Sequence, residues 1–129
     1  MSQQQQTTHE VGRVTIADEP WVEFVDAAGR LKTPVKILSA TNPCILLVQF
    51  TPNLHVDPHS HPFDVIYMPV SGQVDFSDPG EPPLLPGQIR WVKAGHPYGP
   101  EVGGPEGADV LIISMGGDIA IDWLDTDDA

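Results

Sequence analysis

Three of the five histidines in this chain lie between residues 55 and 61, at alternating positions that could form a metal site or an acid–base site. Side chains of an extended strand point alternately to its two faces, so His59 and His61 are expected to point into the same space. Two neutral imidazoles placed together make half of a site for zinc, iron, nickel or copper. The simpler alternative is a polar pair at the rim of the fold that holds no ion.

Two further polar side chains close to this pair could take part in the chemistry. Asp64 would add a carboxylate, and two histidines with one carboxylate are typical of iron(II) sites that use oxygen. It lies three residues after His61, on the wrong face of a straight strand, although Pro62 could break the alternation. His55 would lie on the same face of an extended strand as His59, which makes it a candidate acid or base. The alternative is that His55 simply faces solvent.

The composition favours one acidic domain built from strands. The 129 residues suit a single core, and 12 glycines and 14 prolines between short apolar runs indicate many strands joined by turns. A net charge of −12 argues against nucleic acid and membrane as partners. No stretch has the pattern of a signal peptide or a membrane span, so we expect a cytoplasmic protein. The single cysteine, Cys44, begins an apolar run and is expected to be a buried, inert thiol.

The apolar runs predict an all-β fold with little helix. Residues 1–10 are expected to form a disordered tail, 11–124 one domain, and 125–129 a frayed acidic end. Strands are expected at 11–16, 21–25, 33–38, 44–50, 65–70, 73–76, 88–92, 108–115 and 119–123, with Gly/Pro loops at 94–100 and 103–107. Pro69 indicates an edge or a bulge in its strand. About nine or ten short strands in a chain of this length predict a sandwich or a small barrel.

The histidine segment resembles the first motif of the cupins. That motif runs Gly, five residues, His-x-His, three or four residues, Glu, six residues, Gly. His59 and His61 match the paired histidines, and Gly72 matches the closing glycine. Asn53 stands in place of the opening glycine and Val65 in place of the glutamate.

A second stretch is similar to the second cupin motif, which runs Gly, five residues, Pro-x-Gly, two residues, His. Gly87 and Gly95 match its glycines, while Lys93 stands at the proline position. Tyr98 stands at the position of the histidine, with His96 two residues before it. The resemblance implies a double-stranded β-helix barrel of the jelly-roll type.

With valine in place of the glutamate, the first motif resembles that of the cupin subgroup that contains 2,4'-dihydroxyacetophenone dioxygenase and the ChrR-like cupins. Acetylacetone-cleaving dioxygenase is another cupin that uses three histidines and iron. These likenesses imply one divalent transition metal, with iron(II) favoured and zinc, nickel and manganese as alternatives. A site without metal also stays open.

The metal ligands that the resemblance implies are His59, His61 and a third residue. We favour His96, because in an extended loop it would reach the same face as Tyr98. Tyr98 itself could ligate only after losing its phenolic proton, and Asp64 is the other alternative. In a site without metal, His96 and Tyr98 would act as acid and base together with His55.

Aromatic and charged residues near the two motifs are candidates for a substrate pocket. Tyr67, Phe63 and Trp91 could line an apolar pocket or belong to the core. Arg90 could hold an anionic group of a substrate if its side chain faces the barrel. Glu101, just beyond the second motif, is expected to be a surface acid.

Three functions are compatible with these residues. The first is a cupin metalloenzyme acting on a small enol, β-dicarbonyl or hydroxyketone-like molecule, by dioxygenase-type carbon–carbon cleavage in its most concrete form. The second is a non-redox isomerase, epimerase, lyase or cyclase that uses His and Tyr as acid and base. The third is a non-enzymatic ligand-binding or sensing cupin. The apolar strands at 44–50 and 108–115 exceed what one small barrel must hide, so we also expect a homodimer.

Overall fold

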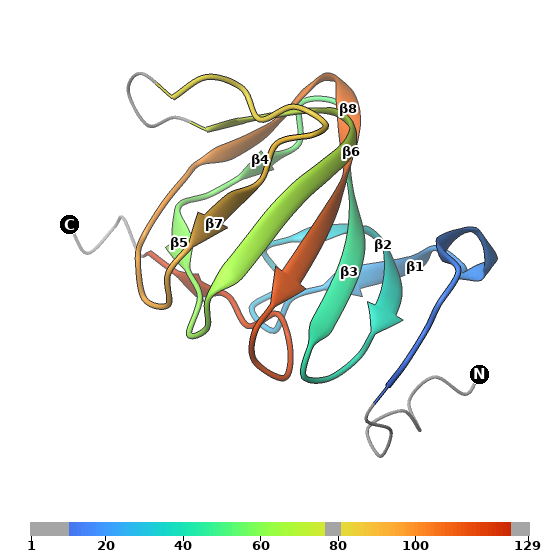
Figure 1. Ribbon diagram of the computed structural model, residues 1–129. Coiled ribbons are helices and arrows are strands. Elements are labelled where there is room, and N and C mark those ends of the chain that lie inside the picture. The colour runs from blue at the N-terminus through green and yellow to red at the C-terminus, as the bar shows by residue number, and fades with distance from the viewer. Residues whose placement is uncertain (1–10, 77–80, 125–129) are drawn as a thin grey trace.

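Nine β-strands hold almost all the regular structure in residues 11–76 and 81–124, the part of the chain that the computed structural model describes (Figure 1). The strands are β1 (Val22–Val25), β2 (Lys32–Ser39), β3 (Cys44–Phe50), β4 (His55–Val56), β5 (His59–Ser60), β6 (Val65–Phe76), β7 (Arg90–Val92), β8 (Glu101–Ser114) and β9 (Asp122–Trp123). The helical segment in this part is a 3₁₀ turn at Ile16–Asp18. The predicted all-β fold with little helix is therefore confirmed. The expected disordered tail and frayed acidic end lie outside the described residues.

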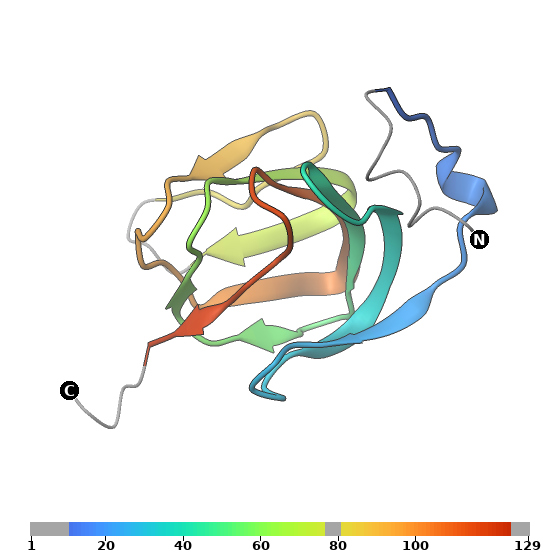
Figure 2. The ribbon, with the colours of Figure 1, turned by 90° about the horizontal axis from the view of Figure 1, so that it is seen from below.

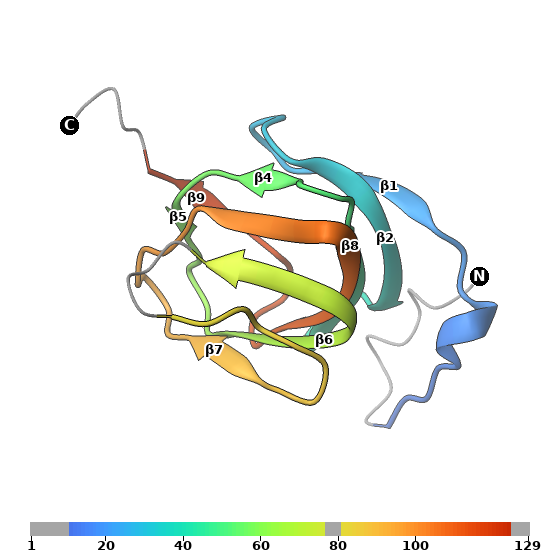
Figure 3. The same cartoon turned by 90° about the horizontal axis from the view of Figure 1, so that it is seen from above.

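One antiparallel sheet wraps around most of the molecule. Its strands follow the order β1-β2-β3-β8-β6-β7, with β4 paired to β8, while β5 and β9 form a second, two-stranded sheet. Strands far apart in sequence thus lie side by side: β3 pairs along its whole length with the end of β8. Seen from above, β6 and β8 curve along their length and close the sheet into a jelly-roll barrel (Figure 3).

The two longest strands were expected to be broken by loops. Instead, β6 joins the strands expected at 65–70 and 73–76 into one, and β8 runs through the loop predicted at 103–107. The pairing register of β6 with β8 shifts at Pro69/Ser71 and again at Gly72/Val74, so bulges absorb the bend. Gly72 adopts a φ of +73°, and a Cβ there would lie 2.0 Å from the carbonyl oxygen of Gly107. Only glycine permits the two backbones to approach so closely.

The first expected strand, at 11–16, does not form. Residues 11–15 have no regular structure, and the side chain of Val11 is 85% exposed. Alternating apolar residues form a strand only where a partner strand is available, and residues 11–16 pair with no strand of the described part of the chain.

The barrel interior is apolar, because alternate residues of the main strands point inward. The side chains of Val35, Val65 and Val110 are at most 1% exposed. Cys44 is also buried, and burial together with the charge of Asp118 raises the pKa of its thiol to about 11. At neutral pH this thiol stays protonated, as expected for an inert core cysteine.

The outer face of the same sheet carries a row of apolar side chains. Residue pairing places Ile45 of β3, Ile113 of β8, Ile66 of β6 and Trp91 of β7 side by side. The Trp91 side chain is 65% exposed. Half-exposed apolar rows that cross four strands are typical of surfaces that bind another protein.

The C-terminal segment crosses one end of the barrel (Figure 2). It ends in β9, which pairs with β5 so that His59 lies opposite Trp123. The backbone N–H of Leu124 donates to the carbonyl of Pro58 at 3.1 Å. This crossing covers the histidine segment and brings residues 119–121 to the barrel interior. Within the described ranges, no helix is long and apolar enough to cross a membrane.

Candidate functional site

The backbone of the histidine segment is hydrogen-bonded to the second motif. His59 and Tyr98 exchange two backbone hydrogen bonds, of 3.0 and 2.9 Å, and the N–H of Gly95 donates to the carbonyl of His61 at 2.7 Å. Both imidazoles point into the barrel, with His59 2% and His61 6% exposed. Their ring centroids lie 4.9 Å apart. The two motifs therefore form one wall of the barrel interior.

A chain of hydrogen bonds begins at His61. Its Nδ1 lies 2.7 Å from the carbonyl oxygen of Ala120, which can only accept, so Nδ1 carries the proton. In the neutral ring, Nε2 is then an acceptor, and the hydroxyl of Tyr98 donates to it at 2.9 Å. The hydroxyl of Tyr67 lies 2.5 Å from that of Tyr98 and completes the chain as its donor.

Burial keeps each member of this chain uncharged. It lowers the pKa of His61, and the backbone hydrogen bond to Ala120 opposes this only in part. Burial and the charge of Glu101 raise the pKa of both Tyr67 and Tyr98 above the ordinary tyrosine value. Tyr98 is therefore a phenol and a hydrogen-bond donor, not a phenolate.

His59 pairs with a carboxylate that the sequence did not predict. Its Nε2 lies 3.1 Å from Oε2 of Glu101, and both side chains are 2% exposed. Burial alone would lower the pKa of His59, but the hydrogen bond and charge of Glu101, helped by the Asp57 carbonyl, raise it. The expectation that Glu101 is a surface acid was wrong. It begins β8, and β4 and β6 both pair with it there, so its side chain turns inward.

One oxygen of Glu101 is left over. Its Oε1 is buried and has no partner within hydrogen-bond distance among the described residues, although the hydroxyl of the neighbouring Tyr67 also interacts with this carboxylate. Glu101 lines a small cavity of about 40 Å³. Besides Glu101, the polar lining residues of this cavity include His59, His61 and Tyr67, and the rest of its wall is mainly aliphatic and aromatic. A buried carboxylate oxygen without a partner is costly, which is why such groups often serve binding or catalysis.

His55 and His96 lie outside this cavity. His55 is exposed on β4 and its Nε2 lies 3.2 Å from Asp57. His96 is exposed as well, and its N–H donates to the carbonyl of Lys93, which closes a tight turn. The expected approach of His96 to the histidine pair assumed an extended loop. The turn at 93–96 breaks the alternation, so Tyr98 alone reaches the interior.

Asp64 also points away from the pair, as its position relative to His61 predicts. Its carboxylate accepts the N–H of Ala94 at 2.8 Å and contacts the ammonium of Lys93 at 3.5 Å. The backbone hydrogen bond lowers the pKa of Asp64, so it is ionised at the surface. Pro62 does not redirect it towards the interior.

The four expected pocket residues divide between the interior and the surface. Tyr67 lines the cavity, whereas Phe63 is 39% exposed and Trp91 lies on the outer face. Arg90 packs over the ring of Phe76 at 3.8 Å and binds Glu81 through two hydrogen bonds of 2.6 and 3.2 Å. Arg90 does not line the inner cavity.

The donor set does not fit the expected metal. Across residues 11–76 and 81–124, no group of three or more His, Cys, Asp or Glu is arranged to hold a metal ion. The Nε2 atoms of the paired histidines, which would face an ion, are engaged by Glu101 and Tyr98. The expected third ligand, His96, lies at the surface.

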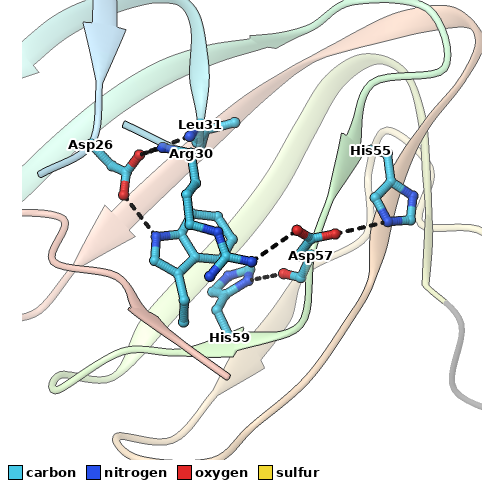
Figure 4. A network of polar contacts seen from close by, with 7 residues as sticks. Asp26, Arg30, Leu31, His55, Asp57 and His59 are labelled. Atoms are coloured by element: carbon cyan, nitrogen blue, oxygen red, sulfur yellow. Dashed lines mark hydrogen bonds and ion pairs between the residues drawn. The ribbon is translucent and has the colours of Figure 1, made fainter. Parts of the chain in front are cut away.

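A second polar network holds the C-terminal segment over His59 (Figure 4). The carboxylate of Asp26 accepts the backbone N–H groups of Ala28, Arg30 and Leu31 and the indole N–H of Trp123 at 2.7 Å. Arg30 stacks 4.6 Å from the centre of the Trp123 ring and donates to Asp57 at 3.0 Å. The carbonyl of Asp57 in turn accepts Nδ1–H of His59. This network fixes both the ring of His59 and the closure of the barrel.

Comparison with known proteins identifies the fold. No family model matches the sequence, and no curated protein matches it. Among solved structures, an RmlC-like cupin protein from Ralstonia eutropha JMP134 is similar with a TM-score of 0.63 and 18% identity, over 88% of this chain and 79% of its own. The acetylacetone dioxygenase of Acinetobacter johnsonii gives a TM-score of 0.68 and 15% identity, covering 91% and 80%. The polyketide cyclase RemF from Streptomyces resistomycificus gives 0.65 and 18%, covering 89% and 86%. The fold is therefore the cupin barrel that the two motifs imply, shared here with both a dioxygenase and a cyclase.

Proposed function

We propose that this protein, which has the cupin fold, catalyses a proton transfer on a small oxygenated molecule, as an isomerase or a cyclase does. The substrate would be a hydroxyketone or β-dicarbonyl compound with a C–H group beside a carbonyl. This is the non-redox alternative among the three functions that the sequence allows. The cyclase RemF, one of the similar structures, is consistent with it.

The unpartnered oxygen of Glu101 carries this proposal. Oε2 is held by the imidazolium of His59, which fixes the carboxylate, and Oε1 lacks a partner within hydrogen-bond distance among the described residues. A carboxylate oxygen with no competing hydrogen bond can act as a general base, because its lone pair is available to a proton of the substrate. His59 then acts as a positioning residue: it fixes the carboxylate, and Asp57 fixes His59.

The chain from Tyr67 to His61 supplies the opposite half of the reaction. When Glu101 Oε1 takes the proton from the C–H group, the electron pair of that bond forms an enolate. The hydroxyl of Tyr67 can turn from Tyr98 and donate a hydrogen bond to the enolate oxygen. The proton on Glu101 then returns to a carbon of the enolate, so atoms and electrons balance without a redox partner. Before substrate binds, Tyr98 and His61 position the hydroxyl of Tyr67 through the hydrogen-bond chain.

Hydrogen–deuterium exchange on a neutral hydroxyketone tests this proposal. We expect the protein to accelerate loss of the α-proton NMR signal of α-hydroxyacetophenone in D₂O over the buffer rate. Glu101→Gln should slow the protein-dependent exchange by about 10²–10⁴-fold, and Tyr67→Phe by about 10²–10³-fold. Glu106→Gln changes an exposed acid remote from the cavity and should leave the rate unchanged. Equal rates for wild type and Glu101→Gln would overturn the proposal.

Oxidative cleavage with a bound metal is the second candidate, because one similar structure is an acetylacetone dioxygenase. Metal analysis of protein purified without a nickel column separates the two functions. A stoichiometric equivalent of iron, with oxygen consumption in the presence of a β-diketone, would favour oxidative cleavage. Exchange activity that survives a strong chelator would favour the proton transfer.

A further inference from the structure

The inner cavity is too small to hold a substrate alone. About 40 Å³ accommodates a few water molecules, whereas small-molecule sites usually measure about 300–1,000 Å³. A second cavity of about 310 Å³ lies beside it. The two cavities share four wall residues, Phe24, Val35, Leu46 and Ile119. Movement of these side chains would therefore join the two spaces.

Ile119 is the wall residue best placed to open. Phe24, Val35 and Leu46 lie in the strands β1, β2 and β3, and Val35 and Leu46 are buried. Ile119 lies in the irregular segment between β8 and β9, is only partly buried, and belongs to the crossing over the barrel end. Its side chain lines both cavities.

The outer cavity, defined by the residues that line it, has an apolar wall and an acidic rim. The apolar lining comes mainly from Phe24, Val25, Val35, Ile37, Leu46 and Ile119. Asp26 and Asp118 are the charged residues of the lining, which contains no Lys or Arg. The four hydrogen bonds that Asp26 accepts hold it ionised. An anionic ligand would be repelled there, and an apolar neutral one would not.

We infer that the outer cavity binds the hydrocarbon part of a neutral substrate, whose polar end reaches Glu101 past Ile119. This rests on the proposed function only in that Glu101 marks the reacting end. The substrate class is thus narrowed to uncharged molecules with a sizeable apolar ring or chain. Anionic substrates, which the sequence left open through Arg90, would be repelled by the acidic rim.

Binding of a matched pair of aromatic probes tests the inference. The neutral probe is 2-naphthol and the anionic one is 2-naphthoate, and titration calorimetry at pH 7 measures each dissociation constant. We expect 2-naphthol to bind at least about tenfold more tightly, because both carboxylates repel the anion. Ile119→Trp should fill the passage and weaken 2-naphthol by about tenfold or more. Ile89→Trp, at a side chain that is 56% exposed, should not.

A second variant does not depend on how Ile119→Trp folds. Asp118 is exposed, so Asp118→Lys should leave the fold intact and bring 2-naphthoate binding to the level of 2-naphthol or above. Glu106→Lys adds the same charge change at a remote exposed site and should leave the preference for 2-naphthol unchanged. The inference would be overturned if the wild-type protein did not bind 2-naphthol. It would also be overturned if 2-naphthoate bound to wild type and to Asp118→Lys with the same affinity.

These measurements report binding and do not require turnover. A protein that binds 2-naphthol as described but fails the exchange assay would overturn the proposed function alone. A protein that exchanges α-protons but binds both probes equally would overturn this inference alone.

Discussion

Replacing Glu101 by glutamine should destabilise the protein more at low pH than at high pH. The pair of Glu101 and His59 is buried, with 3.1 Å between Oε2 and Nε2. Removing one partner of a buried pair typically costs about 3–5 kcal/mol, because the remaining charge has no compensation. In this variant the remaining charge is the imidazolium of His59. Glutamine keeps the volume of the side chain, so packing changes little.

The pH dependence follows from the direction of the His59 shift. Its pKa in the folded protein is raised above the ordinary value of 6.5. The stabilisation by this protonated imidazole is therefore complete below 6.5 and is lost as the pH rises through the folded-state pKa. Above that pKa, His59 is neutral in both proteins, and Glu101→Gln should lower the free energy of unfolding by about 1 kcal/mol or less.

Urea unfolding followed by tryptophan fluorescence measures this difference. We expect the loss in the variant to grow from about 1 kcal/mol or less above the folded-state pKa of His59 towards about 3 kcal/mol at a pH below 6.5. The charge of Glu101 also raises the pKa of His61, so its removal lowers that pKa further and adds to the loss at low pH. Glu106→Gln should show no pH-dependent loss. A loss in Glu101→Gln that is constant with pH, or larger at the higher pH, would refute the assignment of the proton to His59.

Three further results are expected. Tyr98→Phe leaves His61 Nε2 and the Tyr67 hydroxyl without their partner, so the free energy of unfolding should fall by about 1–3 kcal/mol, and an unchanged urea midpoint would contradict the hydrogen-bond chain. Gly29→Ala should lower the free energy of unfolding by about 1 kcal/mol and Gly72→Ala by several times as much, because both glycines have positive φ but only a Cβ at Gly72 would meet backbone atoms. Equal shifts of the melting temperature in the two variants would argue against the close approach. We also propose that the protein forms a homodimer through the apolar outer row. Light scattering should then give twice the monomer mass for the wild type and the monomer mass for Trp91→Asp. A monomer mass for the wild type would refute the dimer.

Much of the fold followed from local patterns. Short β-branched and apolar runs separated by Gly and Pro are enough to predict strands, because side-chain alternation needs no knowledge of the partner strand. The same alternation placed His59 and His61 on one face, and both rings do point inward. The apolar run around Cys44 similarly indicated a buried thiol. The two cupin motifs then supplied the architecture.

The pairing of distant strands decided the rest. Glu101 looks like a surface acid in sequence, because nothing local shows that β4 and β6 flank it and turn its side chain towards His59. His96 looked like a ligand, because the alternation that joins it to Tyr98 holds only in an extended chain, and a turn replaces it. The state of each imidazole likewise depends on a distant partner, Glu101 for His59 and Tyr98 with Ala120 for His61. Residue types and alternation thus determined which side chains could do chemistry, whereas long-range contacts, which set burial and hydrogen bonding, decided which of them meet and which carry the proton.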